Sequence, residues 1–252
     1  MLLEKIVHYL YEYFDIKNFI VNDPAVNELQ VEASEEIHSI ASAVDAGMET
    51  FEEAAKLGVQ MLFVHHGLFW GKCLPITGIH AQRIAFLIKK GISLYAMHLP
   101  LDAHKEIGNN VLLAGLLDLE VIRSFGSYHQ VALGVEAKTK KPVSLEKIFQ
   151  QIEKNLNPKA ILLPFGNPKI QSIGIVSGGG ASNIIEADRK NIDLLITGEV
   201  NYSYYQDAKD RKRNVIFAGH YATETLGIKA LGEHLAKKFN LSHTFIDLPV
   251  AF

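Results

Sequence analysis

The chain has 252 residues, of which 48% are hydrophobic and 21% are charged. This composition is typical of a folded protein and not of a disordered one, and the length suffices for one large domain or two closely packed lobes. The formal net charge of -3 provides no broad attraction to a phosphate backbone, so we do not expect nucleic acid as a partner.

The first residues of the chain and its single cysteine indicate in which cellular compartment the protein is expected. Residues 1–5 lack the basic start and apolar run of a secretory signal, and Cys73 has no second cysteine with which to form an intrachain disulfide. No uninterrupted apolar run approaches the roughly 18 residues of a membrane span. We therefore expect a cytoplasmic protein without a transmembrane segment.

Helices and strands are predicted to alternate in the first half. Apolar residues recur at three- and four-residue intervals from Leu3 to Phe14, as on an amphipathic helix, and Met61–Val64 is apolar throughout, as a buried parallel strand is. The predicted elements are a helix over 1–14, a strand over 37–44, the last part of a helix over 52–57 that ends at Gly58, a strand over 61–64, a helix over 81–90 ending at Gly91, a strand over 93–97 and a helix over 109–117.

The second half repeats the alternation. It contains extended structure over 121–137, a helix over 144–156 with Ser144 as its N-cap, a strand over 173–176, a helix over 183–190, a strand over 194–196, a helix over 202–211, a strand over 215–217 and a helix over 223–239. No Gly/Ser-rich linker separates the halves. We predict an α/β fold of two similar, intimately packed lobes, approximately 1–125 and 126–252, with mixed or mostly parallel sheets and flanking helices.

Polar residues with metal-binding side chains follow three of the predicted strands. His65 and His66 follow Met61–Val64, where side chains leave the sheet and face a crevice. Neighbouring side chains of an extended strand diverge, so two adjacent histidines suit two separate ions better than one. The pair alone is equally consistent with packed or surface histidines.

The other two clusters add carboxylates. Asp102 follows the strand over 93–97 after Pro100, whose stiff turn could direct the carboxylate toward the same crevice; it could equally cap the following turn. His220 and Glu224 are four residues apart, on one face of a helix if the helix begins near His220, although Glu224 also suits a helix N-terminus electrostatically. Three such clusters together predict a metal site, in a single metal-binding domain formed by the two lobes.

Several ordered motifs also resemble the family of GTP cyclohydrolase 1 type 2 homologues, or Nif-three-like proteins, across essentially the whole chain. They are His65-His66-Gly67-Leu68-Phe69-Trp70, His98-Leu99-Pro100-Leu101-Asp102-Ala103-His104 with Gly108-Asn109-Asn110, Ile196-Thr197-Gly198-Glu199, and Gly219-His220-Tyr221-Ala222-Thr223-Glu224. One departure is Asn27-Glu28-Leu29-Gln30, where the family favours Asn-Gly-Leu-Gln; glutamate tolerates a positive φ less well than glycine.

The resemblance implies two α/β lobes, a ring-shaped homohexamer and a dinuclear metal site with His65, His66, Asp102, His220 and Glu224 as ligands. Mixed histidine and carboxylate ligands suit Zn, Fe, Mn or Ni. Two ions about 3.5–4 Å apart would activate a water for hydrolysis, with Asp102 as a candidate bridge. His98, His104 and Glu199 are candidates for orienting ligands or transferring protons, and structural roles are equally open to them.

We therefore predict a dinuclear divalent-metal-binding protein that acts as a metal-dependent hydrolase, with GTP or a related phosphate-containing small molecule as the candidate substrate. The alternative is a non-catalytic regulatory or chaperone-like ring protein that binds metal. Gly178–Gly180 could present backbone N–H groups to phosphate, or could form only a tight strand-to-helix turn. The tyrosines at 202, 204, 205 and 221 could stack a base, or pack against the sheet.

Overall fold

The computed structural model describes residues 1–19, 23–72, 74–128 and 131–250; Cys73 lies outside the described residues. The chain divides into two compact units. Unit 1 comprises Met1–Leu101 and Gly227–Leu248, and unit 2 comprises Asp102–Leu226 and the C-terminal residues from Pro249. The divisions fall within helices α4 (Leu99–Asp102) and α9 (His220–Phe239), whereas the sequence placed a lobe boundary near residue 125.

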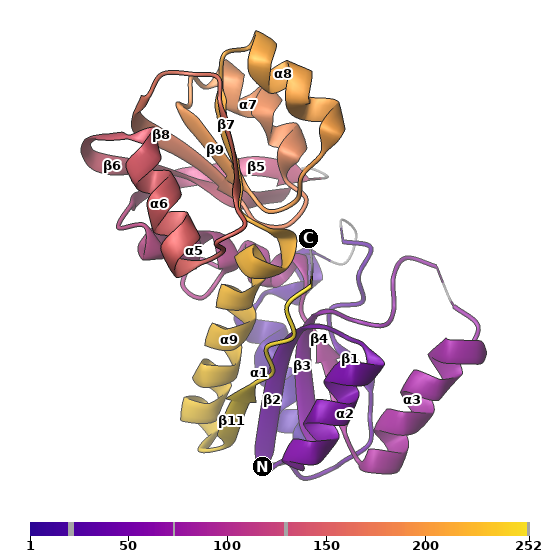
Figure 1. Cartoon of the computed structure of the whole chain (residues 1–252). Coiled ribbons are helices and arrows are strands. Elements are labelled where there is room, and N and C mark those ends of the chain that lie inside the picture. Colours follow the sequence, from indigo (N-terminus) through magenta and orange to yellow (C-terminus); the bar gives the residue numbers. More distant parts are fainter. Residues whose placement is uncertain (20–22, 73, 129–130, 251–252) are drawn as a thin grey trace. The chain divides into compact units, whose positions relative to one another are not determined.

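Unit 1 is an α/β lobe built on a five-stranded sheet in the order β1-β4-β3-β2-β11 (Figure 1). Strands β2, β3 and β4 are parallel to one another and β11 is parallel to β2, while the edge strand β1 pairs antiparallel with β4. Its other elements are α1 (Leu3–Tyr13), η1 (Ile16–Asn18), β1 (Leu29–Val31), β2 (Ser39–Asp45), α2 (Met48–Leu57), β3 (Met61–His66), α3 (Gly78–Lys90), β4 (Ser93–Ala96) and β11 (Ser242–Phe245).

The central strands of unit 1 are buried on both faces. Leu62, Val64 and Leu94 belong to a core cluster with Phe51 of α2 and Leu87 of α3. Alternate residues of β3 point to opposite faces, and those of the other face are fully buried as well. The continuous apolar run in the sequence is therefore explained by helices and loops that exclude water from both sides.

Unit 2 is an α/β lobe built on a six-stranded mixed sheet in the order β5-β6-β8-β9-β10-β7. The neighbours β8, β9 and β10 are parallel, and the remaining pairs are antiparallel. Its elements are α5 (Asn109–Leu116), β5 (Glu120–Tyr128), β6 (Val131–Ser144), α6 (Leu145–Asn155), β7 (Ile161–Pro164), β8 (Lys169–Val176), η2 (Ala181–Asn183), α7 (Ile184–Arg189), β9 (Leu194–Thr197), η3 (Tyr202–Tyr204), α8 (Tyr205–Asp210) and β10 (Asn214–Phe217).

Two apolar clusters cover the two faces of this second sheet. Leu194 and Ile196 pack in one cluster with helix α6, whereas Leu195 packs in the other with α7. This alternation has the two-residue period of a strand. Both lobes thus contain three adjacent parallel strands whose carboxyl ends meet along one edge of a rigid, buried sheet. That edge is where open α/β sheets place ligand sites.

The predicted helix ends are confirmed where the sequence named a specific cap. Gly58 and Gly91 follow α2 and α3 in the left-handed conformation, with φ of 68° and 66°, which glycine adopts without steric cost. Ser144 precedes α6, and its Oγ accepts a hydrogen bond from the backbone N–H of Lys147 at 3.3 Å. Within the described part of the chain, no helix is both long and apolar enough to cross a membrane.

Candidate metal centre

In unit 1, strand β3 extends two residues beyond its predicted end and carries both histidines. It lies between β2 and β4, with Asp45 of β2 opposite His66. His65 is fully buried and His66 is half-buried. Their rings are 4.8 Å apart between centroids. Both imidazoles are therefore positioned by the central strand of the sheet, the most constrained part of this lobe.

Each of these histidines has an oxygen acceptor beside Nδ1. The Nδ1 atom of His65 lies 2.9 Å from the carbonyl oxygen of Met97, and that of His66 lies 2.7 Å from Oδ1 of Asp45. A carbonyl and a carboxylate can only accept, so Nδ1 must donate. In a neutral imidazole the lone pair is then on Nε2, the atom that a metal ion would bind. This is how proteins orient metal-binding histidines.

A third histidine belongs to the same group. The Nδ1 atom of His98 lies 2.9 Å from Oδ1 of Asp23, and ligand-capable atoms of His65, His66 and His98 all lie within 4.8 Å of one another. The sequence had singled out His98 as a supporting residue and had not assigned Asp23 a role. Asp23 is 75 positions from its partner His98 and 76 from its partner Leu99, so no local spacing could have revealed it.

In unit 2, Asp102 is held by two donors. Its Oδ1 accepts a hydrogen bond from Nδ2 of Asn109 at 2.7 Å and from Oγ of Ser177 at 2.9 Å, and its side chain is buried. The neighbouring Asn110 accepts the backbone N–H of Ser177 at 2.7 Å. These hydrogen bonds fix the position of the carboxylate. Among the described residues, Asp102 belongs to no group of three ligand-capable side chains within 4.8 Å.

His220 begins helix α9, as the predicted four-residue spacing to Glu224 requires. Its Nε2 lies 3.1 Å from Oε1 of Glu224, which is 3% exposed, and its Nδ1 lies 3.1 Å from Oε2 of Glu199. The hydrogen bond and charge of Glu224, followed by those of Glu199, outweigh burial and raise the pKa of His220 to about 9. The two carboxylates thus create a negative potential suited to a cation, and Glu199 orients the imidazole.

The loop after β8 lies beside the His220–Glu224 pair of unit 2. Gly178 has a φ of +59°, and a Cβ there would collide with Oε1 of Glu224 and lie 3.1 Å from Nε2 of His220. The backbone N–H groups of Gly178 and Gly180 donate to the hydroxyls of Thr223 and Thr197. These two amides are therefore used inside the lobe, which favours a tight turn beside the His220–Glu224 pair over a phosphate cradle.

The remaining candidates have separate positions. Nδ1 of His104 accepts the backbone N–H groups of Glu106 and Ile107, both at 3.2 Å, which caps a turn. Tyr202 is 91% exposed and Tyr221 is buried, so the tyrosines do not form one stacking surface. Glu28 does not have a positive φ, so the replacement of the family's glycine introduces no backbone strain.

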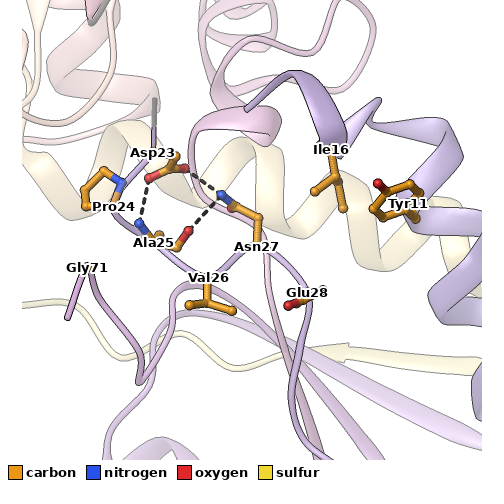
Figure 2. Close-up of a pocket in the computed structure, with 9 residues that line it drawn as sticks. All are labelled: Tyr11, Ile16, Asp23, Pro24, Ala25, Val26, Asn27, Glu28 and Gly71. Atoms are coloured by element: carbon orange, nitrogen blue, oxygen red, sulfur yellow. Dashed lines mark hydrogen bonds between the residues drawn. The ribbon is translucent and has the colours of Figure 1, made fainter. Parts of the chain in front are cut away.

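Unit 1 also contains a cavity of about 270 Å³, whose lining residues are Tyr11, Ile16, Asp23, Pro24, Ala25, Val26, Asn27, Glu28 and Gly71 (Figure 2). Asp23 is common to the cavity wall and to the hydrogen bond with His98. The segment before β1 therefore connects a small cavity with the histidine cluster.

Comparison with known proteins places this arrangement in a family. The family model described as Duf34/NIF3 (NGG1p interacting factor 3) matches residues 1–249. The chain belongs to the DUF34/NIF3 family. It is 45% identical over 98% of its length to a "GTP cyclohydrolase 1 type 2 homolog" of Pyrococcus horikoshii, of which 98% is covered. The family resemblance expected from the sequence motifs is confirmed.

Solved structures of similar chains support the same fold. TTHA1606 from Thermus thermophilus has a TM-score of 0.91 at 36% identity, with both chains fully covered. The protein ybgI, described as of unknown function, has a TM-score of 0.92 at 35% identity, again with full coverage. The DUF34/NIF3 fold of this chain therefore contains histidine and glutamate groups able to hold a metal ion.

The structure leaves no room for a Cβ at Gly178 beside the carboxylate of Glu224. We expect Gly178→Ala to push the Glu224 carboxylate from its position and to strain the backbone, at a cost of about 1 kcal/mol or more in the free energy of unfolding. Thermal and urea unfolding measure that cost, and divalent-metal content measures the displaced carboxylate.

Gly179→Ala is the matched control. A Cβ there lies no closer than 3.5 Å to a neighbouring atom, and Gly179 does not have a positive φ. We expect its stability and metal content to stay near those of the unchanged protein. Equal behaviour of the two variants would show that the close approach at Gly178 has no role in positioning Glu224.

Proposed function

We propose that this DUF34/NIF3 protein binds two divalent metal ions with His65, His66, Asp102, His220 and Glu224, and uses them as a metal-dependent hydrolase. The observation that carries the proposal is the orientation of the histidines: acceptors at Nδ1 of His65 and His66 leave the lone pair on Nε2. In unit 2, the buried carboxylates of Asp102 and Glu224 supply the negative charge that favours a divalent cation.

The chain's own residues have distinct roles in this proposal. Met97, Asp45 and Glu199 hold the imidazole rings of His65, His66 and His220 by accepting from Nδ1. Asn109 and Ser177 hold the carboxylate of Asp102. A bound divalent ion supplies Lewis acidity, which polarises a substrate and promotes loss of a proton from water. His65, Asp102 and Glu224 are buried, so bulk water has little access to the side chains that would hold the ions.

The proposed substrate is GTP or a related phosphate-containing small molecule. Support comes from the name of the relatives, "GTP cyclohydrolase 1 type 2 homolog", and from the hydrolytic chemistry that paired ions favour. The internal hydrogen bonds of Gly178 and Gly180 indicate that any phosphate would be bound elsewhere than by these two amides. A regulatory or chaperone-like ring that binds metal without turnover is the alternative outcome.

Elemental analysis tests the metal part of the proposal. We expect the protein, purified without a metal-chelating column, to contain two divalent ions per chain, and Asp102→Ala to lose most of that metal because a buried ligand is removed. Asp210→Ala, which changes an exposed aspartate of the same unit, is the control and should keep both ions. Metal absent from the unchanged protein would refute the proposal.

Turnover tests the hydrolase part. Metal-loaded protein is expected to hydrolyse a member of a nucleotide, phosphodiester and peptide panel, and His220→Ala to lower the rate by at least about a hundredfold, with its circular dichroism unchanged. Activity that persists in metal-stripped protein would contradict hydrolysis by a metal centre. Stoichiometric metal without any turnover would instead support the non-catalytic ring.

We also propose that the chain assembles into a homohexamer. Support comes from large apolar side chains exposed on and before α3: Ile76, Ile79 and Ile88 are 61%, 55% and 54% exposed. Light scattering coupled to size exclusion is expected to give six times the chain mass of 28.0 kDa. A mass of one chain at micromolar concentration would rule the assembly out, and Ile79→Glu is expected to reduce it because a charge would be buried at the contact.

A further inference from the structure

His98 lies in a loop, yet hydrogen bonds hold both its backbone and its ring. It follows β4, and its ring centroid is 5.1 Å from that of His65 and 5.6 Å from that of His66. Its backbone N–H donates to Oδ1 of Asn27 at 2.6 Å, and its Nδ1 bonds Asp23 at 2.9 Å. Both the main chain and the ring of His98 are therefore held by the segment before β1.

Four hydrogen-bond donors converge on the carboxylate of Asp23. Oδ1 accepts from the backbone N–H of Ala25 at 2.9 Å in addition to His98, and Oδ2 accepts from Nδ2 of Asn27 at 2.7 Å and the backbone N–H of Leu99 at 3.0 Å (Figure 2 draws the bonds to Ala25 and Asn27). The carboxylate of Asp23 is buried and faces Nδ1 of His98 as an acceptor.

The consequence for His98 is the same as for the two strand histidines. Because Asp23 can only accept, Nδ1 of His98 donates, and the lone pair of the neutral ring is on Nε2. These three imidazoles of unit 1 therefore share one tautomer, and one ligand-capable atom of each lies within 4.8 Å of the others. Two nitrogens on one ion are at most about 4.2 Å apart, given metal–nitrogen distances of about 2.1 Å, so the three rings are close enough together to bind a common ion after side-chain adjustment.

We propose that His98 is a further metal ligand, oriented by Asp23, and that His65, His66 and His98 form a three-imidazole set in unit 1. This inference rests on the proposed metal-binding function and adds a ligand and a selectivity to it. Imidazole nitrogen favours borderline transition metals such as Zn, Fe, Co and Ni, whereas Mg and Ca prefer oxygen. The set therefore selects a transition metal over the more abundant Mg.

The single tryptophan provides a built-in reporter for this ligand. The ring centroid of Trp70 is 4.9 Å from that of His98 and 6.0 Å from that of His66. Cobalt(II) bound by these imidazoles is close enough to quench the fluorescence of Trp70. Titration of metal-stripped, full-length protein with Co²⁺ therefore gives an apparent Kd for this location, and the visible absorption of bound Co²⁺ reports a change in its ligands.

We expect His98→Ala to weaken Co²⁺ binding at least about tenfold and to alter the visible absorption, because one nitrogen ligand is lost. His98→Gln, which retains the length of the side chain, serves if the alanine variant does not fold. Asp23→Asn should weaken binding less, since its amide oxygen can still accept from Nδ1 of His98 and only the negative charge behind the ring is lost. A purely structural role would lower the melting temperature of these variants without moving the Kd or the spectrum.

The matched control is His80→Ala. His80 is also half-buried in unit 1 and also packs edge-on against an aromatic ring, that of Phe69 at 5.0 Å, but it is not in the histidine cluster. Its Kd should stay within about twofold of the unchanged protein, and millimolar Mg²⁺ should not displace Co²⁺.

The outcomes separate the two proposals. An apparent Kd and spectrum of His98→Ala equal to those of His80→Ala would overturn the role of His98 while leaving the five-ligand centre intact. Displacement of Co²⁺ by equal concentrations of Mg²⁺ would overturn the selectivity. Failure of the unchanged protein to bind Co²⁺ at all would remove the metal centre itself, and with it the proposed function.

Discussion

The hydrogen bond from histidine Nδ1 to an oxygen acceptor is the interaction on which the candidate site depends. An imidazole has two similar nitrogens, and without such a bond either could carry the proton. The carbonyl of Met97 and the carboxylates of Asp45 and Asp23 remove that choice for His65, His66 and His98. Each acceptor thus leaves one defined nitrogen, Nε2, with which these three side chains could bind a metal ion.

The fold makes these bonds possible because it places their partners at the carboxyl ends of buried parallel strands. His66 and Asp45 end adjacent strands in register, and Met97 follows the next strand. Apolar packing on both faces of the sheet resists movement of those ends. In the second lobe, polar residues also lie after the parallel strands: Ser177, Glu199 and His220 follow β8, β9 and β10.

The sequence predicted what local chemistry determines. Helix periodicity, glycine caps and continuous apolar runs located most helices and the central parallel strands, and the positions after those strands identified the histidines. The edge strands β1, β7 and β11 were missed because each has only three or four residues, too few to display a strand period. The conformation of β1 and β11 comes from pairing with β4 and β2; β11 and β2 are about 200 positions apart along the chain.

The orienting residues could not be predicted for a similar reason. Asp23 and His98 are 75 positions apart, as are Asp102 and Ser177, so no periodicity or spacing relates them. Asn109 stood within a recognised motif, yet only the fold shows that its amide holds Asp102. Candidate metal ligands can be recognised in a sequence by their residue type and position after a strand. The residues that orient them are ordinary polar side chains, and only their contacts in the folded chain identify them.

A crystal structure of the metal-loaded protein, with anomalous scattering collected at the absorption edge of the bound transition metal, would locate the metal directly. We expect anomalous peaks at about 2.0–2.1 Å from Nε2 of His65 and His66, with Nδ1 of His65 still bonded to Met97 and Nδ1 of His66 still bonded to Asp45. Peaks beside Nδ1, or metal bound only at surface positions away from these histidines, would show that the Nδ1 acceptors do not prepare a metal site.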